Sequence, residues 1–397
     1  MKVTAKRSKN VSLWMTSAIV IGLATLFFTT HLRSSLSGSP SPEINFDQFI
    51  ALADSGQLNP ATSAKNRSAN CPRFTDSEDY VQRQRTITIG PESDWATQIQ
   101  QARPDTEIVL LDGRYETDRY AILVGDQTTI RSASQNAESV TIVGQGYGIN
   151  GEGLMIIGND VSIADLSITQ MRDHAIAIKP LQGAKQGTRI YNVHLYDIGT
   201  QHIKLNVGES DGGLVACSTI GYSDNSAKGD YNGAIDLHEA SNWTIRDNTI
   251  YNIRGDGSGC NVDEDCGRYL SGPAILVWNN SENTRITRNR LFDNYRNIAL
   301  GLGRGHSDGK IDNNLIVQSA AGDAGIELQT TTKTTVENNT VILSGTYPGA
   351  IEFRDSDNIA IRNNWITSDP HDRGSNRQIS IQDNTVDPML FDKLTSE

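Results

Sequence analysis

The sequence lacks several features by which common classes of protein are recognised. It contains no Walker phosphate-binding loop and no His-Glu-x-x-His zinc motif. Basic residues are also scarce outside the first 33 residues, which carry five Lys and Arg and no acid, so that the rest of the chain has 30 basic residues against 47 acidic ones. Such an acidic body argues against nucleic-acid binding, because that affinity comes largely from basic contacts to phosphate.

Cysteine is equally scarce, with Cys71, Cys217, Cys260 and Cys266 in 397 residues. No Cys-x-x-Cys pair or adjacent His is present, so a thiolate metal site is disfavoured. Outside the cytoplasm the thiols are expected to be oxidised, and the close spacing in GCNVDEDCG predicts a disulfide between Cys260 and Cys266. The same loop offers hard oxygen ligands for calcium, although an acidic solvated loop explains its composition as well. No cofactor is otherwise indicated.

The amino terminus predicts export from the cytoplasm. A basic run, MKVTAKRSKN, precedes an almost uncharged stretch from Val11 to Thr30, which is long enough to span a bilayer. No small-x-small cleavage site follows Phe28, which favours an uncleaved anchor over a cleaved signal peptide. By the positive-inside rule, Ser34 and all that follows lie outside the cytoplasm. We therefore expect a single-pass protein of the cell envelope, or a secreted one if the segment is cleaved.

Composition divides the chain into three parts. Residues 1–33 form the membrane anchor or signal segment, and residues 34–84, which begin SSLSGSPSPEINF, are typical of a linker. Residues 85–397 contain an internal repeat and form one domain. Asn289, Asn314, Asn339 and Asn364 recur at a spacing of 25 residues, with apolar residues three before and two after each. Asn248 stands in the same column one repeat earlier.

A second strand with alternating apolar residues recurs within each repeat, as in HIKLN, GAIDLH and PAILVW. Short β segments in repeats of about 25 residues predict an all-β, single-stranded right-handed parallel β-helix, in which the Asn column forms a hydrogen-bonded ladder without chemistry. Before the repeats, Asp94 begins a short helix that is expected to cap the open end of the solenoid. We expect a monomer.

The residues also carry a resemblance. A helix ending in ARP, then DTEIVLLDGRY, then coils, resembles the start of extracytoplasmic β-helix polysaccharide lyases of the chondroitinase B and alginate lyase type. The repeats from residue 85 to about 366 are similar to bacterial right-handed parallel β-helix repeat proteins. This resemblance implies the fold strongly and the activity weakly, because one fold hosts lyases, hydrolases, epimerases and binding proteins.

Alternation along the second strand predicts two outward columns of side chains that stack from coil to coil. Neighbouring coils there carry Lys, Asp, His and Trp, which we predict to act on an acidic polysaccharide by β-elimination. Elimination needs a base, an acid and a cation that neutralises the carboxylate. The candidate catalytic residues are Lys204, His238, Asp236 and Arg296, and the candidate substrate-binding residues are Lys179, Asn206, Trp278, Arg304, Glu327 and Arg354.

Three alternatives stay open. Lys204 and Asp236 can equally form a surface ion pair of little consequence, and the protein can be a non-catalytic β-helix that binds glycan or serves envelope assembly. The run Asp369-Pro370-His371-Asp372 matches the DPHD motif of mannuronan C5-epimerases, but it lies near the end of the repeats, where turn residues are expected anyway. Epimerisation begins with removal of the same proton as elimination.

Overall fold

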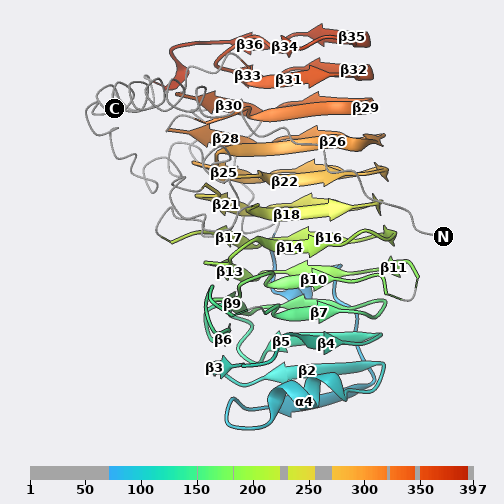
Figure 1. Ribbon diagram of the computed structural model, residues 1–397, viewed down its shortest axis with the longest axis vertical. Helices are drawn as coiled ribbons and strands as arrows, with labels where there is room; N and C mark the ends of the chain where they lie inside the picture. The colour runs from blue at the N-terminus through green and yellow to red at the C-terminus, as the bar shows by residue number, and fades with distance from the viewer. Residues whose placement is uncertain are drawn as a thin grey trace, which may run out of the picture. The chain divides into compact units, whose positions relative to one another are not determined.

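The computed structural model describes residues 71–149, 151–181, 183–223, 231–254, 271–319, 322–344 and 349–391. These residues belong to one compact unit, Ile44–Glu397. They form parallel strands that stack coil upon coil on three faces of a right-handed β-helix, as the repeat predicted (Figure 1). The proposed anchor, residues 11–30, lies outside the described residues. Within the described residues, no helix is long and apolar enough to cross a membrane.

One face, called the β14 face here, carries the candidate site. Its strands are β4 (Ile122–Val124), β7 (Leu154–Ile156), β10 (Ile176–Ile178), β14 (Gln201–Leu205), β18 (Gly233–His238), β22 (Pro273–Trp278), the first part of β26 (Arg296–Ser307), the first part of β29 (Ile326–Glu337), β31 (Ile351–Arg354) and β34 (His371–Asp372).

A second face, the β12 face, adjoins it around the coil. Its strands are β1 (Arg85–Ile89), β2 (Thr106–Leu110), β5 (Thr128–Ser132), β8 (Ser162–Ala164), β12 (Arg189–Tyr191), β16 (Leu214–Ala216), β20 (Thr244–Arg246), β24 (Arg285–Thr287), β27 (Lys310–Asp312), the end of β29, β32 (Asp357–Arg362) and β35 (Arg377–Gln382). Short strands lie between the two faces: β11 (Lys185–Gln186), β15 (Ser210–Asp211), β19 (Ala240–Ser241) and β23 (Ser281–Glu282).

The third face is a separate sheet. Its strands are β3 (Gly113–Glu116), β6 (Val140–Val143), β9 (Ser167–Thr169), β13 (His194–Tyr196), β17 (Thr219–Gly221), β21 (Thr249–Tyr251), β25 (Arg290–Phe292), β28 (Leu315–Gln318), β30 (Thr340–Leu343), β33 (Trp365–Ile366) and β36 (Thr385–Val386). Inward residues of all three faces, such as Ile203, Ile245 and Ile250, are fully buried and form one continuous core.

The Asn column is the ladder that the sequence predicted. Each amide nitrogen donates to the Oδ1 of the Asn one coil further, from Asn248 to Asn289 at 2.9 Å, then through Asn314 and Asn339 to Asn364. The residue before each ladder Asn has a positive φ, for example 58° at Asn313. Asn and Asp tolerate this conformation. In each Asn–Asn pair the first residue therefore turns the chain, and the second donates to a buried backbone carbonyl, as Asn314 does to Ile286.

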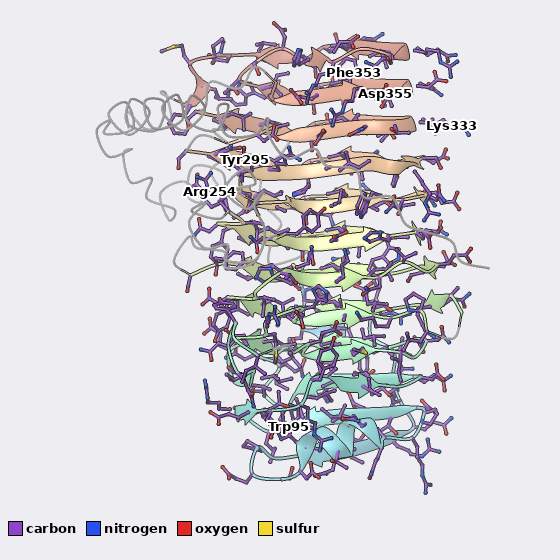
Figure 2. The ribbon with its side chains drawn as sticks, in the orientation of Figure 1. Trp95, Arg254, Tyr295, Lys333, Phe353 and Asp355 are labelled. Atoms are coloured by element: carbon purple, nitrogen blue, oxygen red, sulfur yellow. A yellow bond between two sulfur atoms is a disulfide. The ribbon has the colours of Figure 1, made fainter. Side chains whose placement is uncertain are left out.

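The short helix predicted after Asp94 is α4 (Trp95–Gln100), and Asp94 accepts a hydrogen bond from the Thr97 amide as its N-cap. Trp95 and Ile99 are buried and join the core. Trp95 lies at the end of the stack beside β2 (Figure 2).

Residues 71–84, assigned to the linker from composition, pack on the β12 face instead. Phe74, in the 3₁₀-helix η2 (Phe74–Asp76), is fully buried with Tyr191, Leu214 and neighbouring residues. A disulfide joins Cys71 to Cys217, 146 residues further along the chain. We call residues 71–84 the strap. It is ordered because an aromatic anchor, ion pairs and a covalent bond fasten a polar sequence to the coils.

Candidate functional site

Strand register brings four predicted residues together on the β14 face. Lys204 of β14 lies opposite Asp236 of β18, and His238 of β18 lies opposite Trp278 of β22. Lys204 Nζ is 2.5 Å from Asp236 Oδ2 and 3.0 Å from His238 Nε2. Trp278 Nε1 donates to Asp236 Oδ1 at 2.9 Å. These four residues are called the Lys204 cluster, and all four stand in the outward columns described above.

The Lys204–Asp236 pair is not the exposed ion pair considered above. The side chain of Lys204 is 12% exposed and that of Asp236 is 2% exposed. Placing both charges away from water costs free energy that the mutual attraction and the hydrogen bond from Trp278 offset. A buried ion pair of this kind adds little to stability, because the cost of removing both charges from water offsets their attraction. Its burial therefore favours a functional role for the pair over a purely stabilising one.

His238 is held on three sides. Its Nε2 faces Lys204, its Nδ1 lies 2.9 Å from Asn279 Nδ2, and its ring centroid is 4.6 Å from that of Trp278. Burial lowers the pKa of His238, and the positive charge of Lys204 lowers it further, while Asp236 opposes both. The imidazole is therefore neutral near pH 7 and can give or take one proton.

Arg304 borders the cluster without joining it. Its guanidinium pairs with Glu239, the residue after His238, and its backbone amide donates to Asn279 Oδ1 at 3.2 Å. Sequence reasoning missed Glu239 and Asn279. The available signal was their position, since each directly follows an outward residue of the cluster at the point where its strand ends.

The remaining candidates form a second group further along the face. Arg296 pairs with Asp323, and Arg354 donates to both Glu327 at 3.0 Å and Gln329 at 2.6 Å. Burial raises the pKa of Glu327, although Arg296 and Arg354 oppose the shift. The structure therefore pairs Arg296 with the partly buried Asp323 and Arg354 with the buried Glu327, and the described ion pairs of these arginines do not include Lys204 or His238.

Two predicted substrate-binding residues lie on the other side of the cluster. Lys179 Nζ is 2.9 Å from Glu152 Oε1, a carboxylate that is 3% exposed. The side-chain oxygen of Asn206 is buried without a hydrogen-bond partner.

The DPHD segment is not a simple turn, because His371 and Asp372 form strand β34, which pairs with Glu352 and Phe353 of β31 on the β14 face. Asp372 Oδ1 accepts hydrogen bonds from the Gly374 amide at 2.7 Å and from Asn376 at 2.6 Å. His371 Nδ1 lies 3.2 Å from Glu352, which also pairs with Arg373.

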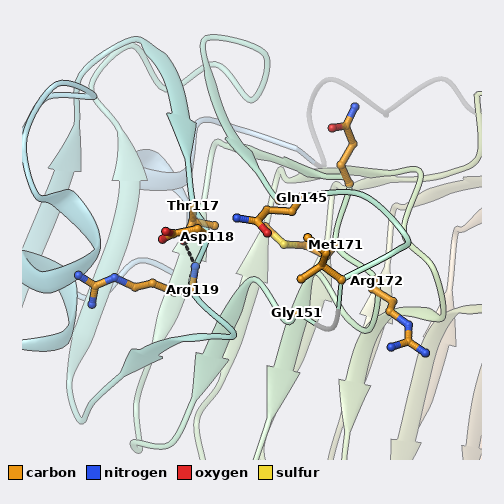
Figure 3. Close-up of a pocket in the computed structure, with 10 residues that line it drawn as sticks. Thr117, Asp118, Arg119, Gln145, Gly151, Met171 and Arg172 are labelled. Atoms are coloured by element: carbon orange, nitrogen blue, oxygen red, sulfur yellow. Dashed lines mark hydrogen bonds between the residues drawn. The ribbon is translucent and has the colours of Figure 1, made fainter.

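Two pockets lined by described residues lie elsewhere. A cavity of about 470 Å³ lies between the strap and strands β20 and β24, lined by Asp79, Arg246, Arg285 and Arg288 among others. The other holds only about 10 Å³ and lies near Thr117, Gln145 and Met171 (Figure 3). We place the candidate site at the Lys204 cluster because it contains an imidazole, which can exchange a proton near neutral pH. The smaller cavity is barely the size of one water, and the larger is lined by arginines, which stay protonated.

Several predictions fall outside the described residues. They are the Cys260–Cys266 disulfide and the calcium site considered for the same loop, which lies in the insert formed by residues 255–272, of which residues 255–270 are not described. Arg254, just before this insert, is described, and its Nε donates to the carbonyl of Asp293 at 2.8 Å.

Comparisons with known proteins agree with the fold. Residues 271–386 match the family described as periplasmic copper-binding protein (NosD). No curated protein matches the sequence. The Agl-KA catalytic domain superposes with a TM-score of 0.53 at 16% identity, covering 72% of this chain and 53% of that chain. Pectate lyase Pel9A gives 0.48 at 10% identity, covering 77% and 82%.

The A-module of the mannuronan C-5 epimerase AlgE6 from Azotobacter vinelandii gives 0.45 at 14% identity, covering 74% of this chain and 96% of that chain. At these identities the likeness shows the fold alone. The chain is a right-handed parallel β-helix protein by its own strand stacking, and what it shares with these proteins is the architecture.

The copper chemistry in the name of the matching family can be tested on the residues present. Residues 271–386 contain no Cys and no Met, and their histidines are His306 and His371. Both ring nitrogens of His306 are buried without a partner, while His371 contacts Glu352. Among the described residues, no group of three His, Cys, Asp or Glu side chains is placed to hold a metal. The described part of this chain does not fit a copper site of the usual nitrogen and sulfur ligands.

Proposed function

We propose that this protein is an exported, carbohydrate-active β-helix protein that cleaves an acidic polysaccharide by β-elimination at the Lys204 cluster. The observation that carries the proposal is the contact of Lys204 Nζ with His238 Nε2 at 3.0 Å, over a carboxylate that accepts hydrogen bonds from both Lys204 and Trp278. An imidazole that is neutral near pH 7 can remove a proton and return it.

The chemistry asks for three roles. A base removes the proton on C5 of a uronate, beside its carboxylate, and the electron pair forms the C4=C5 double bond as the C4–O bond breaks. The departing oxygen takes up a proton, and a cation balances the negative charge that develops on the carboxylate. In this proposal Lys204 and His238 supply the base and the acid, and Arg304 is the neighbouring cation. Asp236 orients Lys204 through their 2.5 Å contact.

Two features support a location outside the cytoplasm. The amino-terminal sequence has the form of an export signal or anchor. The Cys71–Cys217 disulfide is the kind of bond that persists in oxidising compartments and is rare in the cytosol. In the proposal the β-helix is a monomer held at the membrane by residues 11–30, and its partner is an acidic glycan.

A second function is favoured by one observation. Every charged side chain of the Lys204 cluster already contacts another protein group, and none is more than 12% exposed. Such a cluster can also serve a non-catalytic protein that binds glycan on the β14 face, with Lys204 and Asp236 holding two coils together.

The test uses the full-length protein, with and without calcium, on alginates, pectins and glycosaminoglycans, and follows the ultraviolet absorbance of the unsaturated uronate. We expect a signal that Lys204→Ala and His238→Ala abolish. Lys333→Ala is the matched control, because this lysine lies within β29 at the edge of the stack (Figure 2), its side chain is 65% exposed, and its loss should leave the rate unchanged. No absorbance on any substrate contradicts elimination. A change of uronate configuration without absorbance would instead identify a C5-epimerase.

A further inference from the structure

The larger cavity lies between the strap and strands β20 and β24 of the β12 face, and it shares no lining residue with the Lys204 cluster. Its volume of about 470 Å³ falls within the range of about 300–1,000 Å³ that small-molecule sites usually occupy. The strap forms one wall, and outward side chains of neighbouring coils form the floor. We call this cavity the strap pocket.

The strap is fastened on both sides of the strap pocket. Pro72, which lines the pocket, directly follows Cys71, and Cys71 is joined to Cys217 by the disulfide. On the other side, Asp79 pairs with Arg246 at 2.5 Å, and these side chains are only 18% and 14% exposed. The wall is therefore already ordered before a ligand enters, which is typical of a preformed binding site.

Two guanidinium groups on the floor are also fixed in place. Arg285 donates from Nε and Nη2 to Asp312 at 3.2 and 2.9 Å, and Arg288 donates from Nε and Nη2 to Asp247 at 2.7 and 2.8 Å. Such a side-on contact uses two of the five N–H groups of each guanidinium. The opposite edge of each group is left for a ligand in the pocket.

The lining of the strap pocket is polar, and its charges balance. Nine of its ten lining residues are polar or charged, and the other is Pro72. Six are charged, namely Arg246, Arg285 and Arg288 against Asp76, Glu78 and Asp79, so the formal charge of the lining is 3 − 3 = 0. An anion would meet three carboxylates, and a cation would meet three guanidinium groups. The lining therefore favours an uncharged ligand whose groups both donate and accept hydrogen bonds.

Thr287 lacks a partner that such a ligand can supply. This residue lines the pocket, is 1% exposed, and has a buried Oγ1 without a hydrogen-bond partner. Buried hydroxyl groups without a partner are uncommon in proteins, because leaving them unpaired costs free energy. A ligand hydroxyl seated against Thr287 can donate to Oγ1 or accept from it.

We propose that the strap pocket is a second binding site of this protein and that it takes a neutral hexose unit, free or at the end of a glycan. Ring hydroxyls accept hydrogen bonds from the outer edges of Arg285 and Arg288, donate to the carboxylates of the strap, and bond to Thr287. The site binds the sugar without chemistry. It is independent of elimination at the Lys204 cluster, so a failed elimination assay leaves the tests below unaffected.

The first test compares ligands of equal shape and different charge. Isothermal titration calorimetry on the full-length oxidised protein uses glucose, galactose and mannose, together with the uronate and the 2-amino form of each and with glycine as a zwitterion. We expect saturable binding of at least one neutral hexose, and binding at least about 10-fold weaker for its charged forms, since a charge facing like charges costs affinity.

The result that overturns the proposal is equally specific. No saturable binding of any neutral hexose in the millimolar range contradicts it, and so does tighter binding of a charged form or of glycine that Thr287→Val weakens. A uronate that binds at the Lys204 cluster instead is recognised because Thr287→Val leaves its affinity unchanged.

The second test locates the sugar with a matched pair of threonines. Thr287→Val keeps the shape of the side chain and removes only the hydroxyl, so we expect an unchanged Tm and about 3- to 10-fold weaker hexose binding, the loss of one hydrogen bond. Thr284→Val is the control, because Thr284 is also 1% exposed with an unpartnered Oγ1 but does not line the pocket. Equal affinities in the two variants overturn the proposed location.

A second pair of variants tests the floor. Arg285→Lys keeps a positive charge beside Asp312 but loses the planar donor edge, so hexose binding should weaken about 10-fold or more. Arg362→Lys is the control, because Arg362 is 51% exposed against 50% for Arg285, pairs with Glu337 in the same way, and lies outside the pocket. Hexose affinities that match in these two variants contradict a sugar bound on Arg285.

Discussion

Trp278 Nε1 donates a hydrogen bond of 2.9 Å to Oδ1 of Asp236, a carboxylate that is almost completely buried one coil earlier in the stack. The bond joins two neighbouring strands, and its two residues are 42 positions apart in the sequence. It fixes the carboxylate plane so that the other oxygen, Oδ2, meets Lys204 Nζ. Trp278, which the sequence suggested as a substrate-binding residue, thus also serves as a hydrogen-bond donor within the site.

Trp278→Phe should therefore weaken the fold and the site together. The variant removes a hydrogen bond to a charged group, worth about 1.5–3 kcal/mol, and leaves Asp236 with one donor fewer. Thermal melting should show a lower Tm. Trp365→Phe is the control, because the Nε1 of Trp365 is buried with no hydrogen-bond partner, so its loss should cost little. Equal losses in the two variants contradict the role of the Trp278 bond.

The Asn ladder should be more sensitive in its middle than at its end. Asn314 is fully buried and bonds to Asn289, Asn339 and two backbone carbonyls, so Asn314→Ala leaves several buried groups unpaired. We expect a loss of about 1–3 kcal/mol for each such group. Asn384→Ala, at the partly exposed end of the ladder, should cost clearly less. The midpoints of urea unfolding compare the two variants. Similar midpoints contradict the expectation that the middle of the ladder contributes more to stability than its end.

The disulfide should stabilise the strap. Replacing Cys71 and Cys217 by Ser removes a cross-link between residues 146 apart, and we expect a loss of about 2–5 kcal/mol together with proteolytic cleavage within residues 72–84. Peptide mapping of the oxidised protein should recover Cys71 linked to Cys217, and Cys260 linked to Cys266. A link between the two pairs, or an identical Tm with and without reductant, contradicts this account.

Acid should destabilise the fold through buried histidines. Burial lowers the pKa of His174, His202 and His306 to about 4, below the ordinary value of 6.5. Between these values the unfolded chain binds more protons than the folded one, so the free energy of unfolding falls as pH drops from about 6.5 toward 4. Asp165 acts in the opposite direction, because burial raises its pKa to about 6.

His306→Leu isolates one such contribution. Neither ring nitrogen of His306 has a hydrogen-bond partner, so the variant should change stability little at pH 7 and reduce the loss of Tm between pH 7 and pH 5. His202 Nδ1 and Nε2 lie 2.9 Å and 3.2 Å from the carbonyl oxygens of Gly233 and Gly221, and the neutral ring can donate to one of them through its single N–H. His202→Leu removes that hydrogen bond and should lower Tm already at pH 7. An unchanged pH dependence in His306→Leu would show that this histidine does not titrate as described.

The sequence alone determined the solenoid, the Asn ladder and the alignment of the outward columns. A repeat of 25 residues with alternating apolar positions buries its inner face when successive repeats stack as coils. In parallel register, each position of one coil then lies directly beside the same position of the next coil. Lys204, Asp236, His238 and Trp278 could be grouped in advance because they sit at fixed offsets in successive repeats.

Only the tertiary structure decided what these side chains touch. Asn279 and Glu239 lie where strands end. The irregular segment of β26 between Gly301 and His306 breaks the repeat locally and brings Arg304 into contact with both of them. Arg296 turned to Asp323, and the strap returned across the β12 face to join Cys71 to Cys217. Periodicity in the sequence specifies backbone positions and the side of the sheet, whereas the contacts of a side chain also depend on turns, bulges and distant segments that follow no period.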